Sequence, residues 1–488
     1  MKSFISLFSL SLILTLFANT IFAQSNTLKL SPKNPHYFFY KGKTIVLVGS
    51  GEHYGSVINT AFDYKTYLQT IAKDGLNITR LFTGAYIEKP GDFGIKKNTL
   101  APAEANLLLP WKRSNVNGFN LGGNKFDLDQ WDDAYFSRLK QFMAEAEKND
   151  VIVEVNLFSS YYQTGWQYSA LNPNNNINHT DSIKSYLVNS LMNGNILVYQ
   201  EKYVRKLVRE LNAFHNFYFE VQNEPYATLK DTVIIYNEYG DRKDFRNSLE
   251  IVAQSSNNWQ RKVAGWIKEE ESKLPEKHLI SQNISNFQYP VTDPDPNISI
   301  FNFHYALPKA VNENFYLNKV IGFNETGFAG RADLTYRRQA WRFLMAGGGL
   351  FNQLDYSFST GGENGQDTSY AAPGGGSPAL RRQFGILKRF FDNYDLIKLK
   401  PDQSIVIASP GAYTESLSDD KSIWLVYLEH LAMKSYSATL NLPKGKYKAE
   451  WMDVSTGKHI NSYEFTNSKI IVPAGLADKV LVVKKISK

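Results

Sequence analysis

Two Asn-Glu pairs stand at the ends of apolar segments and could carry acid–base chemistry. Glu224 ends the segment FYFEVQNEP, and Glu325 lies in VIGFNETGF, 101 positions later. Pro225 has no N–H group to offer a sheet ladder, so the first segment should stop being a strand at Glu224. Carboxylates about 5 to 5.5 Å apart can serve as acid/base and nucleophile in cleavage of a glycosidic bond with retention, whereas a wider gap would admit water and give inversion.

The elements that must position these glutamates form a repeating pattern between residues 44 and 400. Helical patterns alternate with short β-branched or aromatic segments, which indicates a parallel sheet. The predicted strands are 44–51, 77–85, 151–160, 217–225, 278–285, 298–306, 320–328 and 348–358. The predicted helices are 62–75, 130–150, 196–214, 248–274, 334–348 and 379–398.

Eight strand–helix units in roughly 350 residues fit a (β/α)8 TIM barrel better than an open doubly wound sheet. Residues 288–297 form a Pro-Asp segment without helical periodicity, and the sixth helix is short, so we expect an irregular crossover there. In a TIM barrel the reactive groups sit at the carboxyl ends of the strands. Strands four and seven face one another across the mouth, so Glu224 and Glu325 can share one space.

The two ends of the chain predict export and a second domain. Residues 1–23 contain Lys2, an apolar run and Ala23, the layout of a cleavable signal peptide, with an uncleaved membrane anchor as the alternative. We therefore expect a secreted or periplasmic protein, a barrel over 24–400, and an antiparallel β-sandwich over 401–488, where short strands alternate with turns. No later segment approaches about 20 uninterrupted apolar residues, so stable membrane insertion is not expected.

Composition excludes several other classes. The chain has no cysteine, which removes disulfide scaffolds, thiol nucleophiles and iron–sulfur proteins. Its 54 Lys and Arg against 47 Asp and Glu are thinly spread, so a nucleic-acid footprint is not indicated. The sequence holds no G-x-G-x-x-G after the first strand, no P-loop and no G-x-S-x-G, and its eight histidines have no paired spacing. We expect no metal and no cofactor, and the oligomeric state is not indicated.

The run FYFEVQNEPYA resembles the fourth-strand signature of the clan of retaining (β/α)8 glycoside hydrolases that includes the cellulase/mannanase-like glycoside hydrolase family 5. This resemblance implies that Glu224 is the acid/base and Glu325 the nucleophile. It also implies that Asn223 contacts the substrate 2-hydroxyl. Arg80 in NITRLF matches the arginine that supports the nucleophile in family 5.

Other strand ends match the family in part. His304 and Tyr305 resemble the histidine and tyrosine that follow the sixth strand, although family 5 often has one residue between them. Family 5 members commonly carry a histidine after strand three and a tryptophan after strand eight, where this chain has Asn156 and Tyr356. The resemblance covers the whole barrel in architecture and about four strand ends in motif.

Further candidates come from the residues themselves. His53 and Tyr54, at the end of the first strand, could contact a sugar or simply pack. The aromatic cluster YYQTGWQY, which includes Tyr162 and Trp166, is the best candidate for the wall of a sugar subsite, and Trp166 and Tyr356 are candidate sugar contacts. Side chains alternate along a strand, so Glu154 and Glu220 should point into the barrel, where we expect them to be buried partners of Arg80. The Gly-rich segment 359–377 could be a lid or a connector.

Together these features predict a secreted retaining glycoside hydrolase whose partner is a carbohydrate, a polysaccharide or its oligosaccharides. A raised pKa of Glu224 is expected, because the nearby Glu325 charge would oppose its ionisation. Two alternatives stay open at this point. One is a catalytically idle glycan-binding barrel with the sandwich as a binding module, and the other is a barrel hydrolase that uses the same carboxylates on a different bond.

Overall fold

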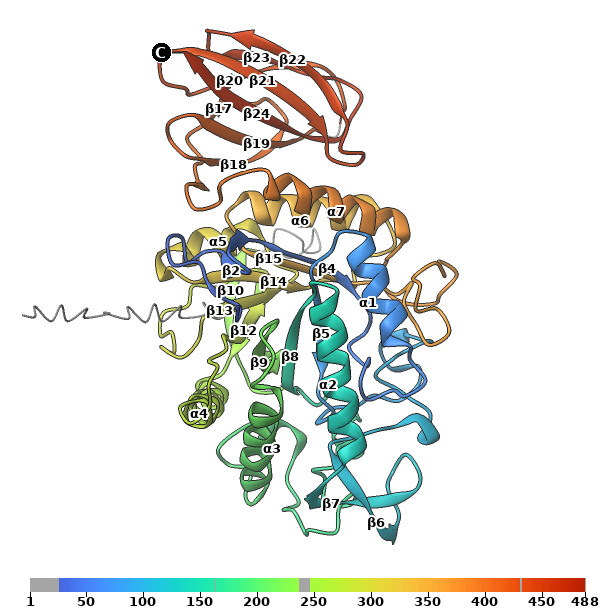
Figure 1. The fold of residues 1–488 in the computed structure, drawn as a ribbon. Helices are drawn as coiled ribbons and strands as arrows, with labels where there is room; N and C mark the ends of the chain where they lie inside the picture. Colours follow the sequence, from blue (N-terminus) through green and yellow to red (C-terminus); the bar gives the residue numbers. More distant parts are fainter. Residues whose placement is uncertain (1–25, 163, 237–245, 431, 488) are drawn as a thin grey trace, which may run out of the picture.

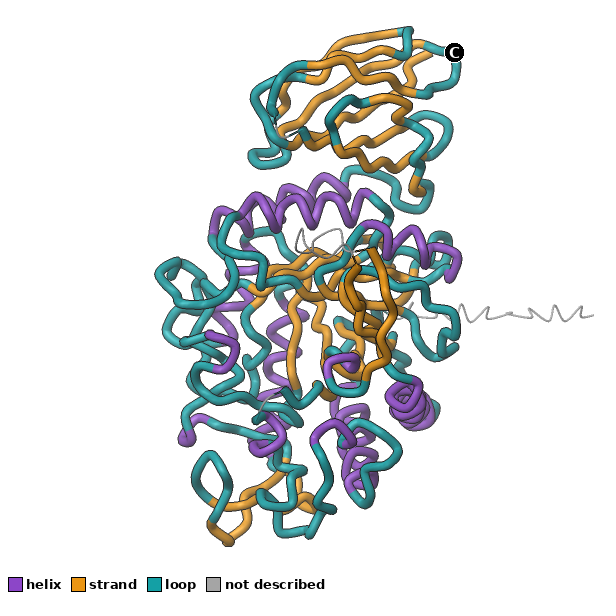
Figure 2. Tube along the Cα trace, turned by 180° about the vertical axis from the view of Figure 1, so that it is seen from behind, coloured by secondary structure: helices purple, strands orange, loops and turns teal. Residues whose placement is uncertain are grey.

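The computed structural model describes residues 26–162, 164–236, 246–430 and 432–487, and the predicted leader, residues 1–23, lies outside this range. A barrel of strands ringed by helices forms one part, and a smaller all-β part sits beyond α6 (Asp333–Met345) and α7 (Pro378–Asp392) (Figures 1 and 2). Within the described ranges, none of the helices combines the length and apolar character needed to cross a bilayer.

Eight parallel strands close into the barrel, which confirms the predicted fold and all eight predicted strands. Each strand is hydrogen-bonded in parallel to the next, and β15 returns to β4 while β9 pairs with β12. The strands are β4 (Leu47–Gly51), β5 (Ile78–Phe82), β8 (Ile152–Ser159), β9 (Phe217–Asn223), β12 (Ile280–Asn286), β13 (Ile300–His304), β14 (Val320–Glu325) and β15 (Leu350–Leu354). Nearly every residue of these strands is buried, as expected when helices cover a parallel sheet.

The helices around the barrel confirm the predicted alternation. Besides α6 and α7 they are α1 (Tyr64–Lys73), α2 (Asp133–Lys148), α3 (Ile196–Leu211), α4 (Gln254–Glu271) and α5 (Pro308–Asn314). Asp63 and Asp132 cap α1 and α2, because their carboxylates accept backbone N–H groups of the first turn. No helix links β12 to β13 among the described residues, and α5 has only 7 residues, so the irregular crossover is confirmed.

Two hairpins that the sequence analysis did not predict extend the carboxyl end of the barrel. One is β6 (Trp111–Asn117) with β7 (Asn124–Trp131), and the other is β10 (Lys230–Tyr236) with β11 (Arg246–Val252). The predicted helices 130–150 and 248–274 are therefore wrong in their first residues, which belong to β7 and β11. Short 3-10 helices complete these loops: η1 (Asp92–Gly94), η2 (Glu104–Asn106), η3 (Gly165–Tyr168), η4 (Ser185–Leu187), η5 (Pro225–Ala227) and η6 (Phe315–Leu317).

The amino-terminal end of the barrel is plugged by a small sheet. It consists of β1 (Lys29–Leu30), β2 (Phe38–Tyr40) and β3 (Lys43–Ile45). Phe38 and Tyr40 pack in one apolar cluster with the first residues of several barrel strands, such as Ile78 and Ile152. Because this end is filled, the carboxyl end is the open one.

The predicted antiparallel sandwich is also confirmed. Its six-stranded sheet has the order β16-β18-β19-β24-β21-β22, and its second sheet has the order β17-β20-β23. The strands are β16 (Lys400–Pro401), β17 (Val406–Ala408), β18 (Tyr413–Ser418), β19 (Ile423–Glu429), β20 (Tyr436–Leu440), β21 (Lys446–Asp453), β22 (His459–Phe465), β23 (Lys469–Val472) and β24 (Asp478–Ser487). Trp341 of α6 stacks on Tyr427 with ring centroids 5.9 Å apart, and Arg337 pairs with Asp478, which fixes the sandwich to the barrel.

Candidate active site

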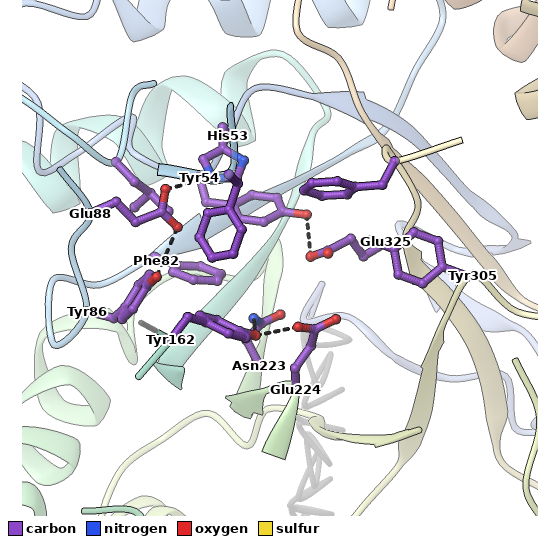
Figure 3. A pocket seen from close by; sticks show the side chains of 13 residues that line it. His53, Tyr54, Phe82, Tyr86, Glu88, Tyr162, Asn223, Glu224, Tyr305 and Glu325 are labelled. Carbon is purple, nitrogen blue, oxygen red and sulfur yellow. Dashed lines mark hydrogen bonds and ion pairs between the residues drawn. The ribbon is translucent and has the colours of Figure 1, made fainter. Parts of the chain in front are cut away.

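A cavity of about 230 Å³ opens at the carboxyl ends of the barrel strands (Figure 3). Its wall combines aromatic rings with a few polar groups, the composition expected of a small-molecule site. The lining residues are His53, Tyr54, Phe82, Tyr86, Glu88, Phe93, Leu100, Tyr162, Asn223, Glu224, Tyr305, Glu325 and Phe328. Both candidate glutamates thus face one space, as strands four and seven of a barrel should allow.

Glu224 and Glu325 lie close together with His304 between them. One carboxylate oxygen of each glutamate and one ring nitrogen of His304 all lie within 4.8 Å of one another. Glu224 directly follows β9 in a left-handed conformation, φ 44° and ψ 55°, which turns the chain outward at the cavity. A non-glycine residue rarely adopts this conformation, and such local strain is concentrated at functional sites. The two carboxylates are thus close enough to act on one bound group.

The two oxygens of Glu325 have different surroundings. Oε2 accepts hydrogen bonds from Arg80 Nη1 at 2.8 Å and from the Tyr54 hydroxyl at 2.9 Å. Oε1 lies 3.5 Å from His304 Nδ1. Arg80 and Tyr54 together stabilise the charged carboxylate of Glu325 and fix its plane. Oε1 is therefore the oxygen better placed to react.

Arg80 is the centre of a buried polar network beneath the cavity. Its Nε donates to Glu154 at 2.9 Å, and its Nη2 donates to Glu220 and, at 2.9 Å, to Asn223 Oδ1. The predicted pairing of Glu154 and Glu220 with Arg80 is confirmed. Burial and the nearby Glu154 raise the pKa of Glu220 well above its usual value, against the lowering effect of Arg80. Arg80 and its three partners, Glu154, Glu220 and Asn223, fill the barrel interior and support the floor of the cavity.

Glu224 is surrounded by donors. His304 Nδ1 lies 2.8 Å from its Oε1, and the Tyr162 hydroxyl donates to its Oε2 at 2.5 Å. Burial acts to raise the pKa of Glu224, but these hydrogen bonds outweigh it, and the pKa is lowered overall. The Tyr226 hydroxyl adds a longer contact to Oε1, at 3.4 Å. The expectation of a raised pKa is thus wrong, because the sequence did not reveal that several donors converge on this carboxylate.

Tyr162 also connects Glu224 to its neighbour in the chain. Asn223 Nδ2 donates to the Tyr162 hydroxyl at 2.9 Å, while Asn223 Oδ1 accepts from Arg80. The amide of Asn223 is thereby oriented with its side chain at the cavity wall. Tyr162 was among the aromatic residues noted in YYQTGWQY, but its contact with the acid/base candidate was not predicted.

The remaining predicted residues divide into two groups. His53, Tyr54 and Tyr305 line the cavity. Trp166 and Tyr356 do not: Trp166 packs edge-on against Tyr161 at 5.0 Å, and Tyr356 is buried behind the wall. The Gly-rich segment 359–377 is held in place where Arg331 donates to the Tyr370 carbonyl oxygen at 3.1 Å.

Several lining residues were not predicted. Glu88, Phe93 and Leu100 all come from the long loop after β5, and Phe328 follows β14. These loops have no hydrophobic periodicity, so the sequence offered no signal for them. Phe82, by contrast, is the last residue of β5, and its position at a strand end could have identified it.

Glu224, His304 and Glu325 are the one cluster in the described ranges whose atoms are spaced to bind a metal ion. Each carboxylate already accepts at least two hydrogen bonds from donors that a cation would repel or displace. A hard cation such as Mg²⁺ or Ca²⁺ would also require more oxygen ligands than this cluster supplies. The donor set fits acid–base chemistry better than metal binding.

The fold, taken as a whole, is similar to that of known carbohydrate-active enzymes. A glycoside hydrolase family 5 structure from Bacteroides vulgatus superposes with a TM-score of 0.61 at 12% identity, covering 94% of this chain and 94% of that one. A second structure, described as a glycoside hydrolase, gives a TM-score of 0.56 at 13% identity, covering 95% of this chain and 98% of that one. The sequence matches no family model, and it matches no curated protein sequence. The similarity confirms the predicted (β/α)8 fold together with its C-terminal sandwich.

Proposed function

We propose that this protein is a retaining glycoside hydrolase that cleaves O-glycosidic bonds of a polysaccharide or oligosaccharide. The observation that carries the proposal is the pair Glu224 and Glu325, whose carboxylates share one cavity within 4.8 Å. Support comes from the donors around them and from the similarity of the fold to glycoside hydrolases. A site that only bound glycans would not need two carboxylates at this spacing.

In the first step Glu325 is the nucleophile. Its Oε1 forms a bond to the anomeric carbon as the bond from that carbon to the leaving oxygen breaks. Arg80 and Tyr54 hold Oε2 and keep Glu325 charged before attack. Glu224 gives its proton to the leaving oxygen, which departs as a neutral hydroxyl group.

In the second step Glu224 is the base. It removes a proton from water, whose oxygen attacks the anomeric carbon and releases Glu325 as a carboxylate. The low pKa of Glu224 suits this role directly. The first step instead requires the fraction of molecules in which Glu224 is protonated, and esterification of Glu325 then removes a neighbouring negative charge.

We also propose that the chain is exported, to the periplasm or the cell exterior. The support is the sequence of residues 1–23, with its basic start, apolar run and Ala23. Amino-terminal sequencing of the protein recovered outside the cytoplasm tests this point. A mature chain that begins shortly after Ala23 is the expected result, and an intact Met1 would contradict cleavage.

A 2-fluoro glycoside with a good leaving group tests the catalytic proposal, because it traps a glycosyl ester on the nucleophile. A mass increase on the peptide that contains Glu325 is expected. Glu325→Ala should abolish turnover, whereas Glu224→Ala should cripple substrates with poor leaving groups and spare activated ones. Equal, mild losses in both variants would contradict the assignment. Glycan binding without trapping or turnover would favour the alternative of an idle binding barrel.

A further inference from the structure

The side of the cavity away from Glu325 carries a second polar group that the proposed bond cleavage does not use. Figure 3 shows Glu88 and His53 there, facing the two glutamates across the open space. His53 Nε2 lies 3.2 Å from Glu88 Oε2, and the Tyr86 hydroxyl donates to Glu88 Oε1 at 3.1 Å. Asn98 donates to Glu88 Oε2 from behind. Both side chains come from loops that follow the first two barrel strands.

This pair is built rigidly. The Glu88 residue is 4% exposed, and the His53 ring stacks on Tyr54 with centroids 5.5 Å apart. A carboxylate offers about four acceptor positions, and three donors reach Glu88 from the protein. The remaining acceptor position is available to a hydroxyl donor in the cavity that Glu88 lines.

The charges of the cavity select against an anionic ligand. Three carboxylates line it, those of Glu88, Glu224 and Glu325. Of the lining residues that the structure describes, His53 is the one that can carry positive charge, and Glu88 already pairs with it. Arg80 lies beneath the wall with its donors engaged. A sugar carboxylate or sulfate would therefore meet uncompensated negative charge.

We propose that His53 and Glu88 form a clamp that recognises a hydroxyl group of a neutral sugar in this cavity. The sugar hydroxyl donates to the Glu88 carboxylate, which His53 Nε2 holds in place. This inference rests on the proposed glycoside hydrolase function and adds a sugar class to it. A site that hydrogen-bonds a substrate hydroxyl strongly rejects the analogue without it, because its own polar groups are then left unpaired.

The test uses 4-nitrophenyl glycosides of several neutral sugars, 4-nitrophenyl glucuronide, and monodeoxy analogues of the best neutral substrate. The wild type should prefer a neutral glycoside to the glucuronide. It should lose about 10- to 100-fold in kcat/KM on at least one deoxy analogue, the factor expected for one hydrogen bond to a charged group. Glu88→Gln should lose a similar factor in kcat/KM on the parent sugar, whereas its kcat/KM on that deoxy analogue should stay close to the wild-type value. The variant should therefore no longer discriminate between the two substrates.

His53→Gln provides a second variant that keeps the Glu88 carboxylate, which guards against a folding defect in Glu88→Gln. Glu104→Gln is the matched control, since Glu104 is an exposed carboxylate on the same loop and lies outside the cavity. If Glu88→Gln lost the same factor in kcat/KM on the parent sugar and on every deoxy analogue, the clamp would be overturned. Efficient cleavage of the glucuronide by the wild type would overturn it as well. If Glu325 is still labelled by the 2-fluoro reagent in that case, the clamp alone fails. Absence of both label and turnover contradicts the proposed function as well.

Discussion

Arg80 Nη1 donates to Glu325 Oε2 across the barrel interior at 2.8 Å, joining β5 to β14. The same guanidinium contacts Glu154 and Glu220, so one cation faces three carboxylates with no solvent exposure of its side chain. The raised pKa of Glu220 follows from this imbalance, because burial favours the neutral form of one member. Arg80 thus supports both the charge of Glu325, the proposed nucleophile, and the packing of the barrel floor.

Replacing Arg80 by Met should destabilise the fold strongly. The change leaves Glu154 and Glu325 buried without their cation, and breaking a buried ion pair typically costs about 3–5 kcal/mol. Chemical denaturation at pH 7 measures the loss. At acidic pH the deficit should shrink, because the orphaned carboxylates become protonated.

Arg80→Lys is the matched control for that experiment. Lysine keeps the positive charge but cannot reproduce the forked contacts to several acceptors, so an intermediate loss is expected. If Arg80→Met denatured at the wild-type midpoint, the buried network would not contribute to stability.

Tyr54 supplies the second hydrogen bond to Glu325, and Tyr54→Phe removes only that hydroxyl. A hydrogen bond to a charged group is worth about 1.5–3 kcal/mol. We expect kcat to fall about 10- to 100-fold on a substrate whose glycosylation is rate-limiting. The melting temperature should change little, because the ring still packs on Phe82. An unchanged kcat would show that Arg80 alone positions the nucleophile.

His304 should set the alkaline limb of the pH profile. Glu224 must be protonated in the first step, and its pKa is lowered by hydrogen bonds from His304 and Tyr162. The wild-type kcat/KM should therefore fall as pH rises from the acidic side. In His304→Ala, fewer hydrogen bonds oppose the effect of burial, which raises the pKa of Glu224. The pKa of Glu224 therefore rises, and the fall in kcat/KM moves to higher pH.

Tyr162→Phe should move the same limb in the same direction by a smaller amount, because the Tyr162 hydrogen bond lowers the pKa of Glu224 less than the hydrogen bond and charge of His304 do. The measurement is kcat/KM against pH, which reports ionisation in the free enzyme. Lower rates in both variants with no displacement of the limb would contradict this origin of the pH dependence.

The barrel and its two glutamates could be predicted because each follows from a local pattern. Strand segments such as 151–160 are rich in β-branched and other apolar residues, and the elements between them repeat with helical period. Glu224 was identifiable because a charged residue followed by proline cannot continue a buried strand. Strand alternation likewise points Arg80, Glu154 and Glu220 into the barrel, and buried charges must be paired, so their mutual contacts could be predicted.

The other side of the cavity could not be predicted, because loops without periodicity build it. Glu88 and Phe93 reach the cavity through a loop whose path depends on tertiary contacts. Trp166 looked like a subsite wall from its composition, yet its ring packs against Tyr161 instead. The hairpin β6–β7 was missed because its strands are largely polar, and β10–β11 because the predicted helix 248–274 includes the apolar end of β11.

His36 should make the protein less stable in mild acid. Its ring stacks on Phe315 with centroids 3.6 Å apart, and burial lowers its pKa from 6.5 to about 4. The unfolded chain binds the proton at a higher pH than the folded one, so stability is retained above pH 6.5 and lost as pH falls towards 4. With partial exposure of the ring taken into account, the loss is on the order of 1 kcal/mol. His36→Phe keeps the stacking and removes the titration, so its melting temperature should decline less than that of the wild type between pH 7 and pH 4. His459→Phe, at an exposed histidine on β22, is the control and should parallel the wild type. Parallel curves for wild type and His36→Phe would contradict the prediction.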